Sequence, residues 1–248
     1  MEQKIKPLAA IILAAGKGTR MNSDQPKVLS EVGKKPMIVH AIHTAKALGA
    51  EKTITVLGYK YEMVQKALKN ESVEYALQLQ QLGTAHAVLQ CREMLNNFQG
   101  NVIILYGDVP LIKVETLSTL IAVHEKENAC STILTTNIPD PTGYGRIIRN
   151  TDHSLKKIVE ENDASDKERK VIEINSGIYV FDNQTLFRLL PLVGSNNKQN
   201  EYYLPDVLNL IIRENGKVAI DKINNYIEIQ GVNNAEQLTE VNEYYEKA

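Results

Sequence analysis

The chain has 248 residues, of which 43% are hydrophobic and 23% charged, and its formal net charge is -2. Such a composition is typical of a folded globular protein and unlike that of a protein with a basic nucleic-acid groove. No apolar run approaches the roughly 20 residues of a membrane span, and the first residues lack the apolar core of a secretory signal. We therefore expect a cytoplasmic protein with neither a nucleic-acid nor a membrane partner. Cys91 and Cys130 lack metal-ligand or redox spacing and are expected to be buried thiols.

The first half of the chain alternates β-rich runs with helical patterns. Strands are predicted over Ala9–Ala15, Thr53–Leu57, Val73–Gln78 and Val102–Tyr106, and helices over Pro36–Leu48, Tyr61–Leu68 and Thr84–Leu95. This alternation predicts βαβ units around a parallel sheet. The loops after the strands then meet at one edge of the sheet, where ligands bind in such folds.

From about Ser131 the predicted strands follow one another more closely. They cover Ser131–Asn137, Arg146–Arg149, Leu155–Glu160 and Gly177–Phe181; helices follow at Asn183–Leu192 and Tyr202–Arg213, then strands Val218–Lys222 and Tyr226–Gln230 and a helix from Ala235. We expect an α/β protein with a mostly parallel, mixed central sheet flanked by helices and a small β-rich lobe. Its predicted divisions are a first half of about 1–130, a second half of 131–233 and a carboxyl-terminal helix over 234–248.

The first predicted strand ends in a glycine-rich, cationic turn, Leu13-Ala14-Ala15-Gly16-Lys17-Gly18-Thr19-Arg20-Met21, followed by Pro26-Lys27. Gly16 and Gly18 leave backbone N–H groups accessible, and consecutive N–H groups form a nest for anionic oxygens. Three cations and one carboxylate accompany them: Lys17, Arg20, Lys27 and Asp24. The pattern predicts a phosphate site, although it fits neither the dinucleotide fingerprint nor the P-loop. An ordinary strand-to-helix turn is the alternative.

Two later segments resemble that turn in placing a polar group after an apolar run. Asp108 follows Val102–Tyr106 and Gly107, and Asn233 follows the predicted strand near Gly231. A carboxylate at the sheet edge opposite a phosphate loop suits Mg²⁺, which takes one or two carboxylates together with phosphate oxygens and water. The alternatives are a turn or helix cap at Asp108 and an N-cap at Asn233, and from spacing alone the cap is favoured at Asn233.

Weaker signals surround these loops. Gln78, Gly83 and Thr84 lie at a strand-to-helix passage whose amide and backbone groups can read a pyrimidine, but a solvated strand end and a helix cap are the alternatives. Gly145, Glu160 and Asn175 suit a sugar pocket, while turns and a surface acid suit the same pattern. His40 and His43 have the spacing of metal ligands without a third partner, which favours a solvated helix face.

Together the motifs resemble those of the uridylyltransferase (pyrophosphorylase) domain of the bacterial bifunctional N-acetylglucosamine-1-phosphate uridyltransferases, from about residue 8 to residue 240. The shared blocks begin at Leu13, Pro26, Gln81, Tyr106, Gly143, Glu173 and Gly231. The resemblance implies a Rossmann-like nucleotidyltransferase fold. It also implies that UTP and N-acetylglucosamine 1-phosphate are the substrates and Mg²⁺ the cofactor, with UDP-N-acetylglucosamine and pyrophosphate as products.

The resemblance also assigns roles by position. The nucleotide is expected to lie against Leu13, Ala14, Ala15, Gly16, Gly18, Gln78, Gly83 and Thr84. The sugar is expected at Tyr106, Gly107, Gly145, Glu160 and Asn175, Mg²⁺ at Asp108 and Asn233, and the catalytic cations are Arg20 and Lys27. This favours ligand roles over the cap at Asn233 and over the turns of the second half.

The family's second half, a hexapeptide-repeat β-helix that acetylates glucosamine 1-phosphate and forms trimers, does not appear in these 248 residues. Acetyl transfer and the trimer are therefore not predicted, the oligomeric state stays open, and the chain is either a natural single-domain relative or a shortened form. Two other functions remain: the same reaction on another sugar phosphate or nucleotide, and a non-catalytic UDP-sugar sensor.

Overall fold

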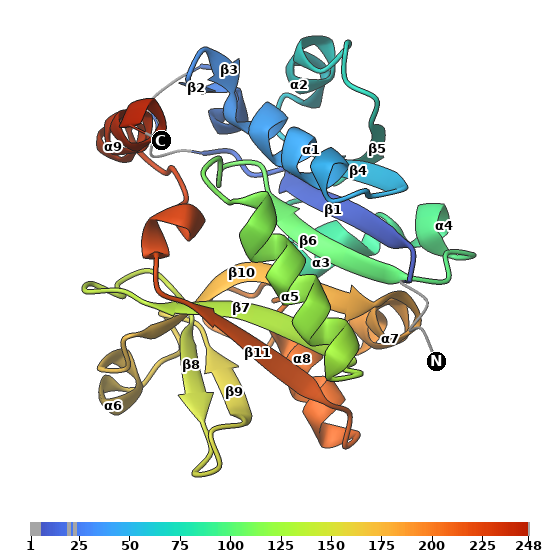
Figure 1. Cartoon of the computed structure of the whole chain (residues 1–248), viewed down its shortest axis with the longest axis vertical. Coiled ribbons are helices and arrows are strands. Elements are labelled where there is room, and N and C mark those ends of the chain that lie inside the picture. The colour runs from blue at the N-terminus through green and yellow to red at the C-terminus, as the bar shows by residue number, and fades with distance from the viewer. Residues whose placement is uncertain (1–5, 19–20, 22–23, 248) are drawn as a thin grey trace.

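The computed structural model describes residues 6–18, 21 and 24–247. Within these residues one nine-stranded sheet forms the centre of the molecule (Figure 1). Its strands are β1 (Leu8–Ala14), β4 (Lys52–Leu57), β5 (Glu74–Leu77), β6 (Asn101–Tyr106), β7 (Ser131–Asn137), β8 (Arg146–Arg149), β9 (Leu155–Val159), β10 (Glu173–Asp182) and β11 (Val218–Ile223).

The strand order is β11-β7-β10-β6-β1-β4-β5, with β8 paired to β10 and β9 to β8. β1 is parallel to β4 and β6, β4 to β5, and β7 to β11. β10 is antiparallel to both β6 and β7 and therefore joins the two halves of the chain into one sheet. The expected α/β class with a mostly parallel, mixed sheet is confirmed.

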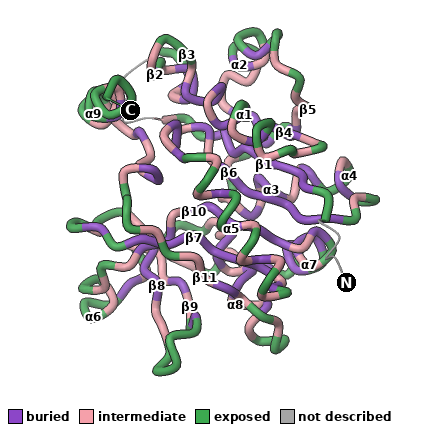
Figure 2. Tube along the Cα trace, viewed as in Figure 1, coloured by how far each residue is buried: buried purple, intermediate pink, exposed green. Residues whose placement is uncertain are grey.

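Helices cover both faces of this sheet. One face packs against α1 (Met37–Ala47), α2 (Tyr61–Ala67) and α5 (Val114–Lys126), and the other against α3 (Thr84–Leu89), α4 (Arg92–Leu95), α7 (Asn183–Leu189) and α8 (Asp206–Arg213). Along β1, Ile11 and Leu13 enter one core while Ile12 and Ala14 enter the other. Burial on both faces explains why the central strands read as continuous apolar runs (Figure 2).

The segment after the glycine loop packs against the end of the chain. It comprises η2 (Lys27–Leu29), β2 (Glu31–Val32) and β3 (Lys35–Pro36), and it lies beside α9 (Ala235–Lys247) in Figure 1. Val32 and Val241 are buried in a small apolar cluster between the hairpin and the helix. The remaining elements are α6 (Asp166–Arg169), η3 (Leu190–Leu192) and η4 (Tyr226–Ile229).

Several predicted elements differ from the structure. The helix predicted over Asn183–Leu192 is divided into α7 and η3, and the strand predicted over Gly177–Phe181 extends over Glu173–Asp182 as β10. Tyr226–Gln230 is not a strand, because Tyr226–Ile229 form η4 and the buried Glu228 accepts a hydrogen bond from Thr116 Oγ1 at 2.5 Å. The helix predicted over Thr84–Leu95 is divided into α3 and α4. The helix predicted from Tyr202 begins only at Asp206, after a proline, which disfavours helical backbone in the residue before it. Cys91 is buried as expected, whereas Cys130 is partly exposed.

Candidate active site

The first side of the site is formed where β1 and β6 end next to each other. Leu13 is paired with Tyr106 in this parallel ladder, and the N–H of Gly107 donates to the carbonyl of Leu13 at 3.0 Å. A Cβ on Gly107 would lie 3.3–3.4 Å from Ile38, Val28 and Ala14, so a small residue lets the two strand ends approach. The glycine loop and Asp108 therefore meet at one edge of the sheet, as the sequence predicted.

A cavity of about 260 Å³ opens at this edge. Seven of the residues expected at the nucleotide line it: Leu13, Ala14, Ala15, Gly16, Gln78, Gly83 and Thr84. Gly18 does not line the cavity but lies beneath Lys27, whose Cβ is 2.6 Å from the position of an added Cβ. Arg20 lies outside the described residues.

Lys27 links three distant segments in the middle of the cleft. Its Nζ pairs with Asp108 Oδ2 and donates to Asn233 Oδ1 at 3.0 Å. The N–H of Val232 donates to the carbonyl of Asp108 at 2.9 Å, which holds the segment carrying Asn233 against the end of β6. The carboxylate and the amide oxygen expected to bind metal are therefore directed toward one cation.

The cap predicted from spacing at Asn233 belongs to its neighbour. Asn234 Oδ1 accepts from the N–H of Gln237 at 2.8 Å in the first turn of α9. The side-chain oxygen of Asn233 instead contacts Lys27, and its backbone N–H donates to Gln237 Oε1 at 2.7 Å. The one-residue offset leaves Asn233 directed into the cleft.

Gln78 and Thr84 have structural partners that the sequence did not reveal. Gln78 is buried rather than a solvated strand end, and its Nε2 lies 2.9 Å from the Gly83 carbonyl and 3.0 Å from His86 Nδ1. Thr84 makes no side-chain cap of α3; its Oγ1 accepts from the N–H of Leu204 at 2.9 Å. Both residues therefore fix the wall of the cavity as well as lining it.

The segment before α8 completes the cleft and was missed by the sequence analysis. The N–H of Tyr202 donates to Leu82 at 2.8 Å, and the carbonyl of Tyr202 accepts from Ala85 at 2.9 Å. A Cβ on Gly83 would lie 2.5 Å from the carbonyl oxygen of Tyr202, so only glycine allows this approach. Glu201 consequently lines this cavity and also a second cavity that adjoins it. The sequence signal was Pro205, which disfavours helical backbone at Leu204 and therefore a helix beginning at Tyr202.

The second cavity, of about 310 Å³, adjoins the first and shares Thr84, Tyr106 and Asp108 with it. Four of the residues expected at the sugar line it: Tyr106, Gly145, Glu160 and Asn175. Gly107 lines neither cavity and packs below them. The residues that the prediction missed here include Gln199 and Tyr203.

The wall of the second cavity is built from a bulge in β10. Register shifts between Asn175 and Tyr179, where Gly177 has a φ of 81°. Asn175 Oδ1 accepts from the N–H of Gly177 at 2.9 Å and from the Tyr179 hydroxyl at 2.8 Å. A Cβ on Gly177 would lie 2.7 Å from the ring of Tyr106. The glycine therefore lets Tyr106 reach the boundary between the two cavities.

The two ends of the cleft differ in charge. Lys27 lines the first cavity but not the second, Glu160 lines the second but not the first, and Glu201 lines both. Burial, together with the nearby carboxylates of Asp206 and Asp163, raises the pKa of Glu160 to about 7, against an opposing contribution from Arg146. Burial also raises the pKa of Glu201. The second cavity therefore suits a ligand rich in hydroxyl groups, not a phosphate.

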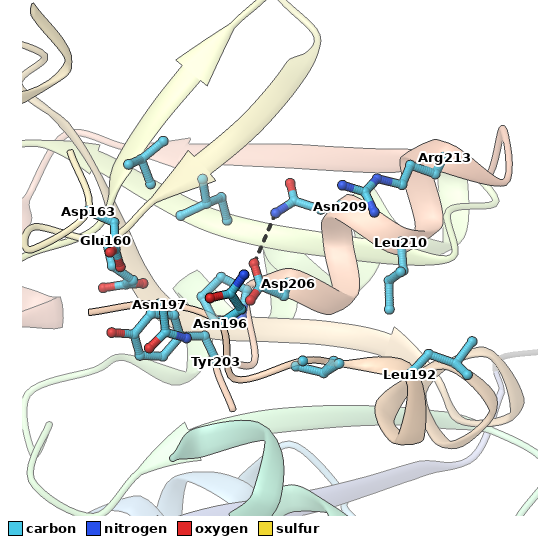
Figure 3. A pocket seen from close by; sticks show the side chains of 15 residues that line it. Glu160, Asp163, Leu192, Asn196, Asn197, Tyr203, Asp206, Asn209, Leu210 and Arg213 are labelled. Carbon is cyan, nitrogen blue, oxygen red and sulfur yellow. Dashed lines mark hydrogen bonds between the residues drawn. The ribbon is translucent and has the colours of Figure 1, made fainter. Parts of the chain in front are cut away.

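A third cavity, of about 590 Å³, adjoins the second and shares Glu160, Tyr203 and Pro205 with it (Figure 3). Asp206 accepts from Asn209 Nδ2 there at 3.1 Å. Figure 3 shows Asp163 beside Glu160 and Arg213 at the far end of the cavity. After burial, which is the largest cause, the carboxylates of Asp206 and Asp163 around this cavity contribute to the raised pKa of Glu160.

The histidines do not build a second site. His40 Nε2 lies 2.8 Å from the carbonyl of Val32, and its ring packs edge-on against Tyr245 at 5.2 Å, so His40 is not the solvated residue predicted. His43 pairs with Glu71 at 3.0 Å. Among the residues that the structure describes, no group of three or more His, Cys, Asp and Glu side chains converges to hold a metal.

A glycine loop and an acidic strand end that meet beside two adjoining cavities are the arrangement expected of a nucleotidyltransferase. Residues 9–245 match the nucleotidyl transferase family, and the chain belongs to it. It is 45% identical over 244 residues to "Bifunctional protein GlmU" of Staphylococcus carnosus (strain TM300) and 49% identical over 240 residues to that of Alkaliphilus metalliredigens (strain QYMF). The matches cover 95% and 97% of this chain but 54% and 52% of those proteins, so the chain spans about half their length. The predicted resemblance is confirmed.

Solved structures support the fold. "UDP-glucose pyrophosphorylase complexed with UDP-glucose" superposes with a TM-score of 0.77 at 21% identity, covering 99% of this chain and 100% of that one. A putative glucose-1-phosphate thymidylyltransferase from Bacillus anthracis, in complex with a sucrose, has a TM-score of 0.72 at 20% identity and covers 97% of this chain and 96% of its own. The Rossmann-like nucleotidyltransferase fold is thus confirmed. In the described residues no helix has the length and apolar character to cross a membrane.

Proposed function

We propose that this chain transfers the uridylyl group of UTP to N-acetylglucosamine 1-phosphate, giving UDP-N-acetylglucosamine and pyrophosphate. The observation that carries the proposal is one cleft whose nucleotide and sugar cavities meet at Tyr106 and Asp108, beside Lys27. The identity of the substrates rests on the sequence motifs and on the relatives named GlmU. In this proposal both substrates are small molecules, and the protein works in the cytoplasm.

The charge distribution orients the two substrates. UTP lies along the glycine loop, with its base toward Gln78 and its phosphates toward Lys27 and Arg20. The sugar ring enters the cavity of Glu160 and Asn175, because hydroxyl groups can hydrogen-bond to a carboxyl and an amide whereas a phosphate would be repelled there. The sugar phosphate then points back toward Lys27, next to the α-phosphate of UTP. Functionally, we assign about 1–130 to the nucleotide, 131–233 to the sugar and 234–248 to a supporting helix.

The reaction is then an in-line displacement. A phosphate oxygen of the sugar phosphate attacks the α-phosphorus, the bond from that phosphorus to the oxygen bridging the β-phosphate breaks, and pyrophosphate leaves with the electron pair. Since the attacking oxygen is already an anion, the step needs no general base and no covalent intermediate. Catalysis consists of positioning and of stabilising the charge on the phosphates by Lys27, Arg20 and the N–H groups of the loop.

Asp108 and Asn233 fit Mg²⁺ in this scheme. Both offer an oxygen to the same ammonium group of Lys27, which shows that the two oxygens converge on one cationic position. One carboxylate, one amide oxygen, water and substrate phosphates form the oxygen set that Mg²⁺ prefers. When bound, the ion would neutralise charge on the phosphates.

The test is a pyrophosphate-release assay with a panel of nucleoside triphosphates and sugar 1-phosphates, with and without Mg²⁺. We expect release only with Mg²⁺ and the highest kcat/KM for UTP with N-acetylglucosamine 1-phosphate. A higher kcat/KM for another pair would show that the protein performs the same reaction on that pair of substrates. Tight binding of a UDP-sugar without release from any pair would identify the chain as a sensor.

A further inference from the structure

The ammonium group of Lys27 occupies the position where a metal held by Asp108 and Asn233 would stand. It pairs with Asp108 Oδ2 and lies 3.0 Å from Asn233 Oδ1. The Lys27 and Asp108 side chains are only 13% and 17% exposed, so this pair is well shielded from water. Mg²⁺ binds its oxygen ligands at about 2.0–2.1 Å. An ion at that distance from both oxygens would overlap or closely approach the ammonium, and the two cations would repel each other.

Lys27 has a second direction open to it. It lines the nucleotide cavity together with Ala15 and Gly16, where the phosphates of a nucleotide are expected. The base of its side chain passes over Gly18, which has no side chain to obstruct it. A lysine ammonium on a flexible four-carbon chain can exchange a carboxylate for a phosphate by rotating its own bonds.

We propose that Lys27 is a built-in competitor of the metal. In the free protein its ammonium group occupies the position between the Asp108 and Asn233 oxygens that the metal would take. When the metal binds, the ammonium group moves to the nucleotide phosphates. The inference rests on the proposed function, because it requires a metal and a triphosphate in the same cleft. Its consequence is reciprocal: a nucleotide that captures Lys27 strengthens metal binding, and the metal strengthens nucleotide binding by the same factor.

The experiment measures Mn²⁺ binding to the nucleotide-free protein by electron paramagnetic resonance of the free ion. Mn²⁺ is a suitable probe because carboxylate, carbonyl and water ligands serve it as they serve Mg²⁺. Lys27→Met removes the competitor, and we expect it to bind Mn²⁺ about five- to a hundredfold more tightly than the wild type, the range of ordinary coupling between ligands. Lys17→Met removes a charge from the exposed part of the same loop and is the matched control.

Three outcomes decide the matter. Tighter binding in Lys27→Met but not in Lys17→Met supports the inference. An equal gain in both variants, or no gain in either, overturns it, because a general change in charge or no competition at all would then explain the data. If Asp108→Asn binds Mn²⁺ as well as the wild type, the metal part of the proposed function fails too, whereas loss of binding in Asp108→Asn limits the failure to the role of Lys27.

A second measurement covers the case in which Lys27→Met does not fold. The wild-type protein is acetylated with a water-soluble ester, and modification of Lys27 is followed by peptide mass spectrometry. Saturating Mg²⁺ without nucleotide should increase the modification rate of Lys27, because the ion displaces its amine from Asp108. An unchanged or lower rate at saturation overturns the inference.

Discussion

At the scale of single residues, we expect substitution of Lys27 to lower the activity most. It is the described cation that contacts both oxygens at the centre of the cleft. We expect Lys27→Ala to lower the turnover number by about two to three orders of magnitude, as loss of other preorganised charge stabilisers does. The measurement is pyrophosphate release at saturating substrates.

Lys46→Ala is the control for that substitution. Lys46 lies on α1 and pairs with Glu71 at 2.6 Å, outside both cavities of the cleft. It should leave the turnover number unchanged. A Lys27→Ala protein that turns over at nearly the wild-type rate would contradict the catalytic role.

Glu160 gives the protein a pH dependence that one substitution can isolate. Its pKa is about 7 in the folded protein, against 4.5 for an ordinary glutamate. Between these values the unfolded chain has lost the proton and the folded chain keeps it, so this group lowers the free energy of unfolding as pH rises through that window. Glu160→Gln cannot ionise. From about pH 5 to about pH 8 its stability should therefore improve relative to wild type, by at most about 3 kcal/mol.

Urea unfolding of both proteins at several pH values measures this difference. The quantity of interest is how the difference in the free energy of unfolding between the two proteins changes with pH, because other titrating groups affect both proteins alike. Curves that stay parallel across the window would show that Glu160 titrates normally in the folded state.

At the scale of elements, α9 holds the hairpin β2–β3 through Asn242. The side chain of Asn242 accepts from the N–H of Gly33 at 3.1 Å and donates to the carbonyls of Glu31 at 3.2 Å and Leu238 at 3.0 Å. Tyr245 packs over Gly33, where an added Cβ would lie 1.9 Å from its ring. Lys27 lies shortly before this hairpin and Asn233 shortly before α9, so the contact between hairpin and helix helps to hold these two residues together.

We therefore expect Asn242→Ala to lower the free energy of unfolding by about 1–3 kcal/mol, because it leaves backbone groups of the hairpin without partners. The midpoint of urea unfolding measures the loss. Thr239→Ala is the matched control, since the Thr239 hydroxyl donates to Ala235 within the same helix at 3.0 Å. Equal losses in the two variants would argue against a special role of Asn242.

At the scale of the whole molecule, the first and second halves of the chain share one sheet and the buried clusters on both of its faces. β10 of the second half pairs with β6 of the first, and Ile11 and Tyr179 belong to the same buried cluster. We expect a single unfolding transition that coincides by circular dichroism and by tyrosine fluorescence, with no tryptophan to complicate the signal. UTP with Mg²⁺ should raise the midpoint of unfolding while the transition stays single. Two separated transitions would show that the halves fold independently.

Several parts of this protein could be predicted from its sequence because the relevant physics is local. The apolar runs of β1 and β6 and the glycines and polar groups that follow them specify strand ends whose chemistry suits anions and cations. Parallel pairing then brings these ends together, and the structure places Leu13 beside Tyr106 as that rule requires. The role of Asn233, by contrast, came from resemblance, because its spacing alone favoured the cap that Asn234 makes.

Only the tertiary structure decided which residues far apart in sequence contact each other. Asn233 meets Lys27 across 206 positions, and Leu204 binds Thr84 across 120. No local pattern marks either partner, since an amide after a strand or a tyrosine-rich segment before a helix is found in many surroundings. Gln78 is a different case, because its side chain is buried against partners close in sequence, Gly83 and His86. The sequence by itself therefore determined the chemistry available at each strand end, and the packing of distant segments decided which groups meet.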